Sequence, residues 1–175
     1  GDSLAIGGNH FIHAIRRNIN LNAILFNNEI YGLTKGQYSP TSKLGKITKT
    51  SPYGTVEKPF NPGELVIGAK GTFFARSIDM EVNLTKECLI AAAKHQGMSV
   101  TEVLQNCVIF NDTTLHSMLA AMKYPDYPVA LGVIRSVEDE IVYDQAVEKQ
   151  VEEVKAQSKI HCVDDLLHSG ATWEI

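Results

Sequence analysis

Residues 23–32 read Ala-Ile-Leu-Phe-Asn-Asn-Glu-Ile-Tyr-Gly. The apolar half predicts a buried strand over 22–26, and the carboxamides Asn27 and Asn28 follow where that strand ends. Small residues at the start of the chain and a helical pattern over 6–17 precede it. A glycine turn at a helix N-terminus presents N–H groups to phosphates, and amide and carbonyl oxygens are ligands for Mg²⁺. This order of elements therefore predicts a cradle for a diphosphate and a divalent metal.

Helix-like and strand-like segments alternate along the rest of the chain. A helix over 84–95 is expected to have Asn83 as its N-cap and Gly97 as its C′ residue. The first helix would bury a face made of Ile6, Phe11, Ile12 and Ile15. Further helices are predicted over 64–69, 114–122, 139–157 and 163–168, and further strands over 72–78, 102–109 and 129–133.

This alternation predicts a single α/β domain over 1–175, with a mostly parallel sheet flanked by helices. Ligands of such sheets bind at the carboxyl ends of strands, and Asn28 and Cys107 both fall near predicted strand ends. A long loop over about 38–62 is rich in proline, and a helical tail covers about 139–175. Loops of this length are usually functional or mobile, so a partner subunit or a closed active site is expected to order residues 43–60.

The composition excludes several classes of protein. The chain has 175 residues, of which 44% are hydrophobic and 21% charged, as in ordinary soluble domains. Its net charge of -4 gives no reason to expect nucleic acid as a partner. No apolar run approaches the roughly 18 residues that a membrane span needs. An odd set of 3 widely spaced cysteines argues against a disulfide framework and favours a reducing compartment, so a cytoplasmic location is expected.

Several motifs along the chain resemble one family. They are Gly1–His10, Phe26–Ser42, Gly71–Ser77, Gln105-Asn106-Cys107 with Phe110-Asn111-Asp112, and Ser169–Ile175. In these motifs the chain resembles the β subunit of 2-oxoacid:ferredoxin oxidoreductases, in particular the 2-oxoglutarate branch, which implies a thiamine diphosphate-binding fold. The resemblance runs from end to end of the chain but omits the N-terminal part of the family's β subunit, so the chain is expected to be its C-terminal part.

The family pattern has Gly-Asp-Gly, a spacer in the mid-twenties, and Asn-Asn. If Gly1 is the last glycine of that motif, Asp2 through Phe26 supply 25 spacer residues. If Gly1 and Asp2 open the motif instead, Ser3 replaces its last glycine and only 23 residues remain. The first alignment is preferred, and it implies that the metal-binding aspartate would precede the chain.

The resemblance also implies site residues. The side-chain oxygen of Asn28 and the backbone carbonyl of Ile30 would bind Mg²⁺. Backbone groups of Gly1, Asp2, Gly32, Leu33 and Thr34 would contact the diphosphate of the cofactor. From the residues alone, Asn28 also suits an ordinary turn, and Gly32 simple loop flexibility. Lys35 suits the charge of a phosphate or a substrate carboxylate, or a solvated loop.

Cys107 would be one of four ligands of a [4Fe–4S] cluster, as the resemblance implies. The other three would lie in the missing N-terminal part, so the cluster is expected only in the complete subunit, and this chain alone is expected to bind none. A lone cysteine after a strand is otherwise usually a small buried hydrophobe. Cys88 and Cys162 have no metal-ligand spacing to Cys107.

The implied reaction is the thiamine diphosphate-dependent oxidative decarboxylation of a 2-oxoacid, with 2-oxoglutarate favoured, to an acyl-CoA. Its partners would be the α subunit, ferredoxin, CoA and the 2-oxoacid, and the isolated chain is expected to be inactive. No catalytic residue, including the glutamate that activates the cofactor, is assigned to this sequence. Two alternatives remain: another thiamine diphosphate-dependent decarboxylase or ligase, and an inactive truncated fragment that acts only as a binding module.

Overall fold

The computed structural model describes residues 2–110, 130–158 and 162–168. Gly1, the helix predicted over 114–122, the motif residues Asn111 and Asp112, and the last seven residues, 169–175, lie outside these ranges.

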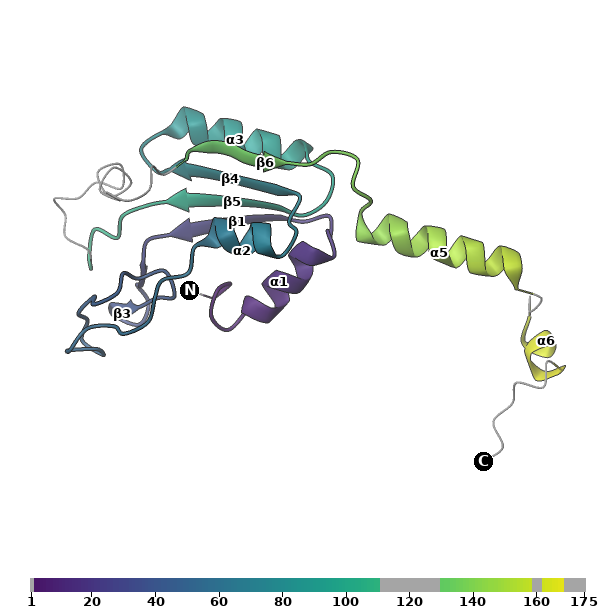
Figure 1. Ribbon diagram of the computed structural model, residues 1–175, viewed down its shortest axis with the longest axis horizontal. Coiled ribbons are helices and arrows are strands. Elements are labelled where there is room, and N and C mark those ends of the chain that lie inside the picture. The colour runs from purple at the N-terminus through teal and green to yellow at the C-terminus, as the bar shows by residue number, and fades with distance from the viewer. Residues whose placement is uncertain (1, 111–129, 159–161, 169–175) are drawn as a thin grey trace.

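A four-stranded sheet forms the centre of the molecule, with the strand order β1-β5-β4-β6. Strands β1 (Asn22–Asn27), β5 (Ser99–Leu104) and β4 (Phe73–Ile78) are parallel, whereas β6 (Gly132–Ser136) runs antiparallel to β4. Figure 1 shows the arrowheads of the three parallel strands at one edge of the sheet. The prediction of an α/β fold with a mostly parallel sheet is confirmed.

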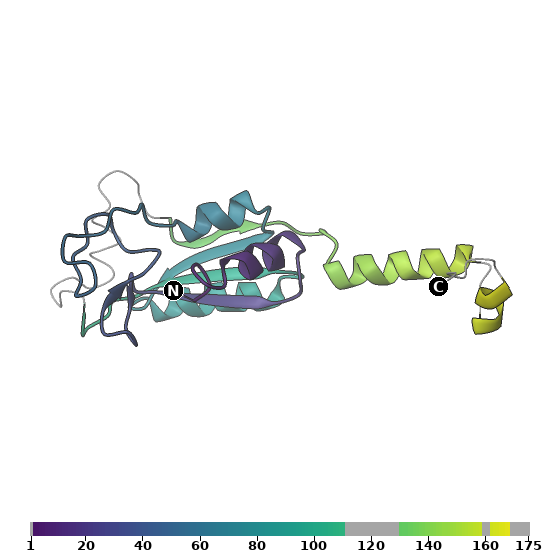
Figure 2. The same ribbon diagram turned by 90° about the horizontal axis from the view of Figure 1, so that it is seen from below.

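Helices cover both faces of this sheet (Figures 1 and 2). On one face α1 (Gly8–Arg16) and α2 (Pro62–Gly68) pack on Phe74 and Val100. On the other face α3 (Val82–Lys94) packs on Phe73 and Ala75 through Cys88 and Ala92. Adjacent residues of β4 therefore enter different halves of the core, as the alternation of side chains along a strand requires.

The first two elements differ from their predictions in detail. Phe11 and Ile15 are buried as expected, but Ile6 is 91% exposed because the helix begins only at Gly8. In β1, Ile24 and Phe26 are 46% and 64% exposed, so the predicted buried strand is only partly buried, through Ala23 and Leu25 on the α1 side.

The strand predicted over 102–109 is misplaced. Strand β5 begins at Ser99 and ends at Leu104, and its polar residues Ser99, Thr101 and Glu102 are all buried between β1 and β4. A pattern of apolar residues cannot find a strand whose buried side chains are partly polar.

The caps predicted for α3 are also wrong. Its N-cap is Glu81 rather than Asn83, without a side-chain hydrogen bond, and its C-cap is His95. Gly97, expected at C′, lies two residues beyond that C-cap with φ +113°. Its positive φ belongs to the bend between α3 and β5, where Asn18 lies against it.

The predicted long loop contains a small hairpin at its start. Strands β2 (Ile30–Tyr31) and β3 (Gln37–Tyr38) pair antiparallel beyond the end of β1. The remainder, up to α2, has one isolated bridge between Thr48 and Ser51.

Helices α5 (Tyr143–Gln157) and α6 (Val163–His168) form a tail that extends away from the sheet (Figures 1 and 2). The predicted apolar side of α5, namely Tyr143, Val147, Val151 and Val154, is 39–60% exposed. The helix contacts the rest of the domain through Tyr143, whose ring lies 5.9 Å from the Arg17 guanidinium. None of the described helices has the length and apolar content to cross a membrane.

Candidate functional site

Several segments meet at the carboxyl edge of the parallel strands. The chain after β5 starts beside β1, since the Gln105 N–H donates to the Asn27 carbonyl over 3.0 Å. It then reaches the hairpin, where the Phe110 ring packs on Gly36: a Cβ added at Gly36 would lie 2.9 Å from the Cδ1 atom of Phe110. The N-terminal turn lies nearby, because the Asp2 carboxylate adds to burial in raising the pKa of Tyr31.

The Asn27-Asn28 pair forms two overlapping turns at this edge. The Asn28 Oδ1 atom accepts from the Ile30 N–H over 3.2 Å, and the Asn27 Oδ1 atom accepts from the Glu29 N–H over 3.3 Å. Glu29 adopts φ +56°, a left-handed conformation that only its surroundings can hold. The carboxamides and carbonyls of this turn therefore have a fixed arrangement.

The hairpin loop after β2 presents open backbone. The Lys35 N–H donates to the Gly32 carbonyl and the Gly36 N–H to the Tyr31 carbonyl, each over 3.1 Å. Leu33 is 99% exposed, and a Cβ added at Gly32 would meet no described atom within 4 Å. A ligand can therefore approach the main chain of this loop closely.

Buried hydroxyl groups support the turn from behind. The Thr41 hydroxyl donates to the Asn27 Oδ1 atom over 2.7 Å, and the Ser42 hydroxyl to the Glu29 carbonyl over 2.5 Å. The Ser39 N–H donates to the Ser42 Oγ atom over 2.8 Å. The motif Ser39-Pro40-Thr41-Ser42 contributed to the family resemblance, but nothing in its pattern revealed this role.

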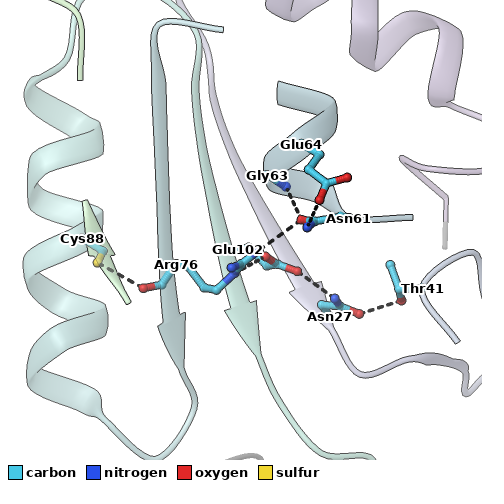
Figure 3. Close-up of polar contacts among 8 residues, drawn as sticks. All are labelled: Asn27, Thr41, Asn61, Gly63, Glu64, Arg76, Cys88 and Glu102. Atoms are coloured by element: carbon cyan, nitrogen blue, oxygen red, sulfur yellow. Dashed lines mark hydrogen bonds and ion pairs between the residues drawn. The ribbon is translucent and has the colours of Figure 1, made fainter. Parts of the chain in front are cut away.

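A buried carboxylate lies beside Asn27, at the end of β1 (Figure 3). Glu102 is 1% exposed, and its Oε2 atom accepts from the Arg76 Nε–H over 2.7 Å while its Oε1 atom accepts from the Asn27 Nδ2–H over 2.7 Å. The Arg76 guanidinium lies 5.4 Å from the Phe74 ring centre and donates to Asn61, the N-cap of α2. Sequence reasoning missed this network, although a Glu in a predicted strand was a signal for it.

A cavity of about 430 Å³ adjoins the hairpin. Its lining, as far as the structure describes it, contains three lysines and no acidic residue. The Lys46 Nζ atom donates to the Glu29 carbonyl over 3.1 Å, and burial lowers the pKa of this lysine against the opposing effect of Glu29. The lining consists of Ile30, Lys35, Gly36, Lys46, Ile47, Thr48, Lys49, Pro52 and Phe110.

The three cysteines lie in different environments. Cys107 is half-buried three residues beyond β5, near enough to Lys46 to act on its pKa. Cys88 is buried between α3 and the sheet, which raises the pKa of its thiol, and Cys162 is exposed. Within residues 2–110, 130–158 and 162–168, no three His, Cys, Asp or Glu side chains are grouped to hold a metal.

The structure thus brings together most of the residues expected at the site. Asn28 lies in the turn that leads into the hairpin, and Ile30, Gly32, Leu33 and Thr34 lie in the hairpin itself. Asp2 acts on Tyr31 of the hairpin, and Cys107 lies beyond β5. Gly1 lies outside the described residues.

Comparison with known proteins identifies the family of this chain. The family described as "Thiamine pyrophosphate enzyme, C-terminal TPP binding domain" matches residues 1–103. The 2-oxoglutarate oxidoreductase subunit KorB of Mycobacterium tuberculosis is 56% identical over 118 residues, which are 67% of this chain and 32% of that protein. The 2-oxoglutarate synthase subunit KorB of Archaeoglobus fulgidus is 49% identical over 107 residues, which are 61% of this chain and 40% of that protein.

A solved structure agrees with these relatives. The 2-oxoglutarate:ferredoxin oxidoreductase from Magnetococcus marinus, with 2-oxoglutarate, coenzyme A and succinyl-CoA bound, superposes with a TM-score of 0.81 at 26% identity. The match covers 98% of this chain and 65% of that one. The chain spans about a third to two fifths of the length of the two curated relatives. The resemblance found in the sequence motifs is confirmed, and the chain belongs to the thiamine pyrophosphate enzyme family, of which it contains the C-terminal cofactor-binding domain.

Proposed function

We propose that this chain is part of the β subunit of a 2-oxoglutarate:ferredoxin oxidoreductase and binds the diphosphate end of thiamine diphosphate at the hairpin edge. The names of the relatives and of the solved structure support the reaction class. The observation that carries the proposal is the hairpin itself. Its turn fixes oxygen atoms at the carboxyl edge of the sheet, beside the open backbone around Gly32.

The residues present fit Mg²⁺ and a diphosphate. Asn28 would supply its side-chain oxygen and Ile30 its carbonyl oxygen, the hard ligands that Mg²⁺ prefers. A carboxamide oxygen has two lone pairs, so the hydrogen bond from the Ile30 N–H is compatible with a metal contact. Backbone groups of Gly1, Asp2, Gly32, Leu33 and Thr34 would hold the diphosphate oxygens. When bound, the thiamine ring supplies the electron sink for decarboxylation.

The cavity beside the hairpin suits an anionic substrate. Lys35, Lys46 and Lys49 line it, and 2-oxoglutarate and CoA are both anions. Lys46 is half-buried, so its charge is less screened by water than that of a surface lysine. These lysines would draw the substrate towards Ile30 and the cofactor.

Cys107 would supply one thiolate to a [4Fe–4S] cluster, with the other three from parts of the subunit beyond these 175 residues. The cluster would pass electrons to ferredoxin. The carboxylate that activates the cofactor is not assigned to Glu102, because that side chain is 1% exposed and ion-paired with Arg76 inside the sheet. That residue would come from another segment or from the α subunit.

The test is an assay of the full-length subunit in complex with its α subunit. We expect ferredoxin reduction that requires 2-oxoglutarate, CoA, thiamine diphosphate and Mg²⁺, with little activity towards pyruvate. The variant N28A should raise the Mg²⁺ requirement, and C107S should lower the iron content, whereas C162S, at an exposed cysteine, should do neither. Release of an aldehyde without ferredoxin reduction would instead indicate a non-oxidative decarboxylase, and a complex that binds no cofactor would indicate an inert module.

A further inference from the structure

We infer that Glu102 is a positioning residue, which sets the orientation of the Asn27 carboxamide and thereby the shape of the Asn28–Ile30 turn. The inference rests on the proposed function, in which that turn holds the metal of the cofactor. Glu102 itself would touch neither metal nor cofactor, because it is 1% exposed and its contact toward the end of β1 is the Asn27 amide (Figure 3).

The first step is the direction of the Asn27 side chain. An ionised carboxylate only accepts hydrogen bonds, so the group of Asn27 that faces Glu102 is its NH₂ group. The two ends of an asparagine amide are similar in shape, so its hydrogen-bond partners decide which way it faces. Glu102, fixed in the sheet and 1% exposed, is such a partner.

The second step leads from Asn27 to the turn. With its NH₂ group on Glu102, the Asn27 Oδ1 atom faces the Thr41 hydroxyl at 2.7 Å and the Glu29 N–H at 3.3 Å. These contacts, with the Ser42 hydroxyl on the Glu29 carbonyl, hold Glu29 at φ +56°. The left-handed Glu29 in turn brings the Ile30 N–H to Asn28.

The third step is the stability of Glu102 itself. Arg76 is its neighbour in the parallel register of β4 and β5, and the two side chains form an ion pair of 2.7 Å. Arg76 is held in place by the Phe74 ring and by Asn61 at the start of α2. The carboxylate is therefore oriented from β4 and α2, and it orients Asn27 at the end of β1.

A swap of donor and acceptor groups tests this order of contacts. In E102Q the new amide cannot accept from both Arg76 and Asn27, so one pair of donors must face each other. In the double variant N27D/E102Q every contact has a donor and an acceptor again. The amide introduced at position 102 accepts from Arg76 and donates to the carboxylate introduced at position 27, which in turn accepts from the Thr41 hydroxyl and the Glu29 N–H. The net charge of the double variant equals that of the wild type.

The measurement is the Mg²⁺ concentration for half-maximal binding of thiamine diphosphate, followed by calorimetry on the full-length subunit in its native assembly. We expect E102Q and N27D each to raise this Mg²⁺ concentration about 10-fold, as loss of residues that orient metal ligands does. In the double variant the Mg²⁺ concentration should return to within about 3-fold of the wild-type value. T41V, at the edge of the network, should raise it by a smaller factor and serves if E102Q does not fold. The control is T101V, on the same strand, whose buried hydroxyl has no partner among the described residues.

Unchanged Mg²⁺ dependence in E102Q, or a double variant no better than the single ones, would overturn the positioning role while leaving the proposed function intact. Lower thermal stability with normal Mg²⁺ affinity would have the same meaning, because it is what a merely structural ion pair gives. A wild-type complex that binds no thiamine diphosphate would refute the proposed function, and the inference with it.

Discussion

Substitution of Gly97 by alanine should destabilise the domain by about 4 kcal/mol, from a strained backbone and disturbed buried hydrogen bonds. Gly97 adopts φ +113°, and a Cβ there would overlap the Oδ1 atom of Asn18 and lie 2.6 Å from its Cγ. Asn18 is 5% exposed, and its Oδ1 atom accepts from the Thr72 hydroxyl over 2.8 Å and from the Met98 N–H over 2.9 Å. The added methyl group must therefore displace an acceptor that two buried donors share.

The magnitude follows from two contributions. An L-residue in this left-handed conformation costs about 1–2 kcal/mol. Each buried donor that loses its acceptor costs about 1–3 kcal/mol, and a partial loss at both Thr72 and Met98 brings the total to about 4 kcal/mol. With a urea m-value of about 2 kcal/mol/M, the unfolding midpoint would fall by about 2 M.

The assay is urea unfolding of the full-length subunit, followed by far-UV circular dichroism. The matched control is G132A, because Gly132 has a similar φ of +98° but a Cβ there would meet no described atom within 4 Å. This control should lose only the conformational part, about 1–2 kcal/mol. Equal losses in G97A and G132A would refute the role of Asn18, and a loss below about 1 kcal/mol in G97A would refute the account of Gly97 altogether.

Two further predictions concern charged groups in the sheet. R76M leaves Glu102 buried without a cation and should lower the free energy of unfolding by about 3–5 kcal/mol. E102L should lower it somewhat less, because Arg76 is 15% exposed, and R76M/E102L should lower it by far less than the sum of the two. Additive losses in urea unfolding would contradict a coupled pair. The His95 Nε2 atom lies 2.8 Å from the Thr72 hydroxyl, and burial lowers the pKa of this histidine. As the pH falls, His95 is therefore protonated in the unfolded chain before it is protonated in the folded one. Stability should therefore decline as the pH drops below about 6.5, and H95Q should flatten the dependence of the unfolding midpoint on pH between about 7 and 5; an unchanged slope would count against it.

The sequence predicts the parts of the fold that follow simple patterns. Strand β4 and helices α1, α2 and α6 were found within two residues at each end, because their apolar periodicity or their proline and cap signals are local. The predicted range of β5 is displaced because Ser99, Thr101 and Glu102 are polar yet buried. Their burial depends on the neighbouring strands β1 and β4, which a local pattern does not reveal. The caps of α3 were wrong because a good capping residue, Asn83, lies inside the first turn of the helix that forms.

The candidate site was predictable where it depends on a motif and not where it depends on packing. The hairpin of Asn28, Ile30 and Gly32 corresponds to the Asn-Asn and Gly-Leu-Thr-Lys-Gly motifs in the sequence. Its support by Glu102, Arg76 and Thr41 joins residues up to 75 positions apart, so no local pattern reveals it. The roles of Asn28, Ile30 and Cys107 in binding metal remain predictions, and the N28A and C107S variants test two of them.

Helix α5 has a consequence for how substitutions in this protein should be interpreted. None of its residues is buried, and it meets the domain at Tyr143 alone among the contacts described above. A helix of 15 residues with so little support is only marginally stable by itself, and changes along it hardly affect the free energy of the sheet. Sequence drift should therefore be fast there unless another surface selects against it. Any position of α5 that proves invariant among relatives would then report on binding rather than on folding.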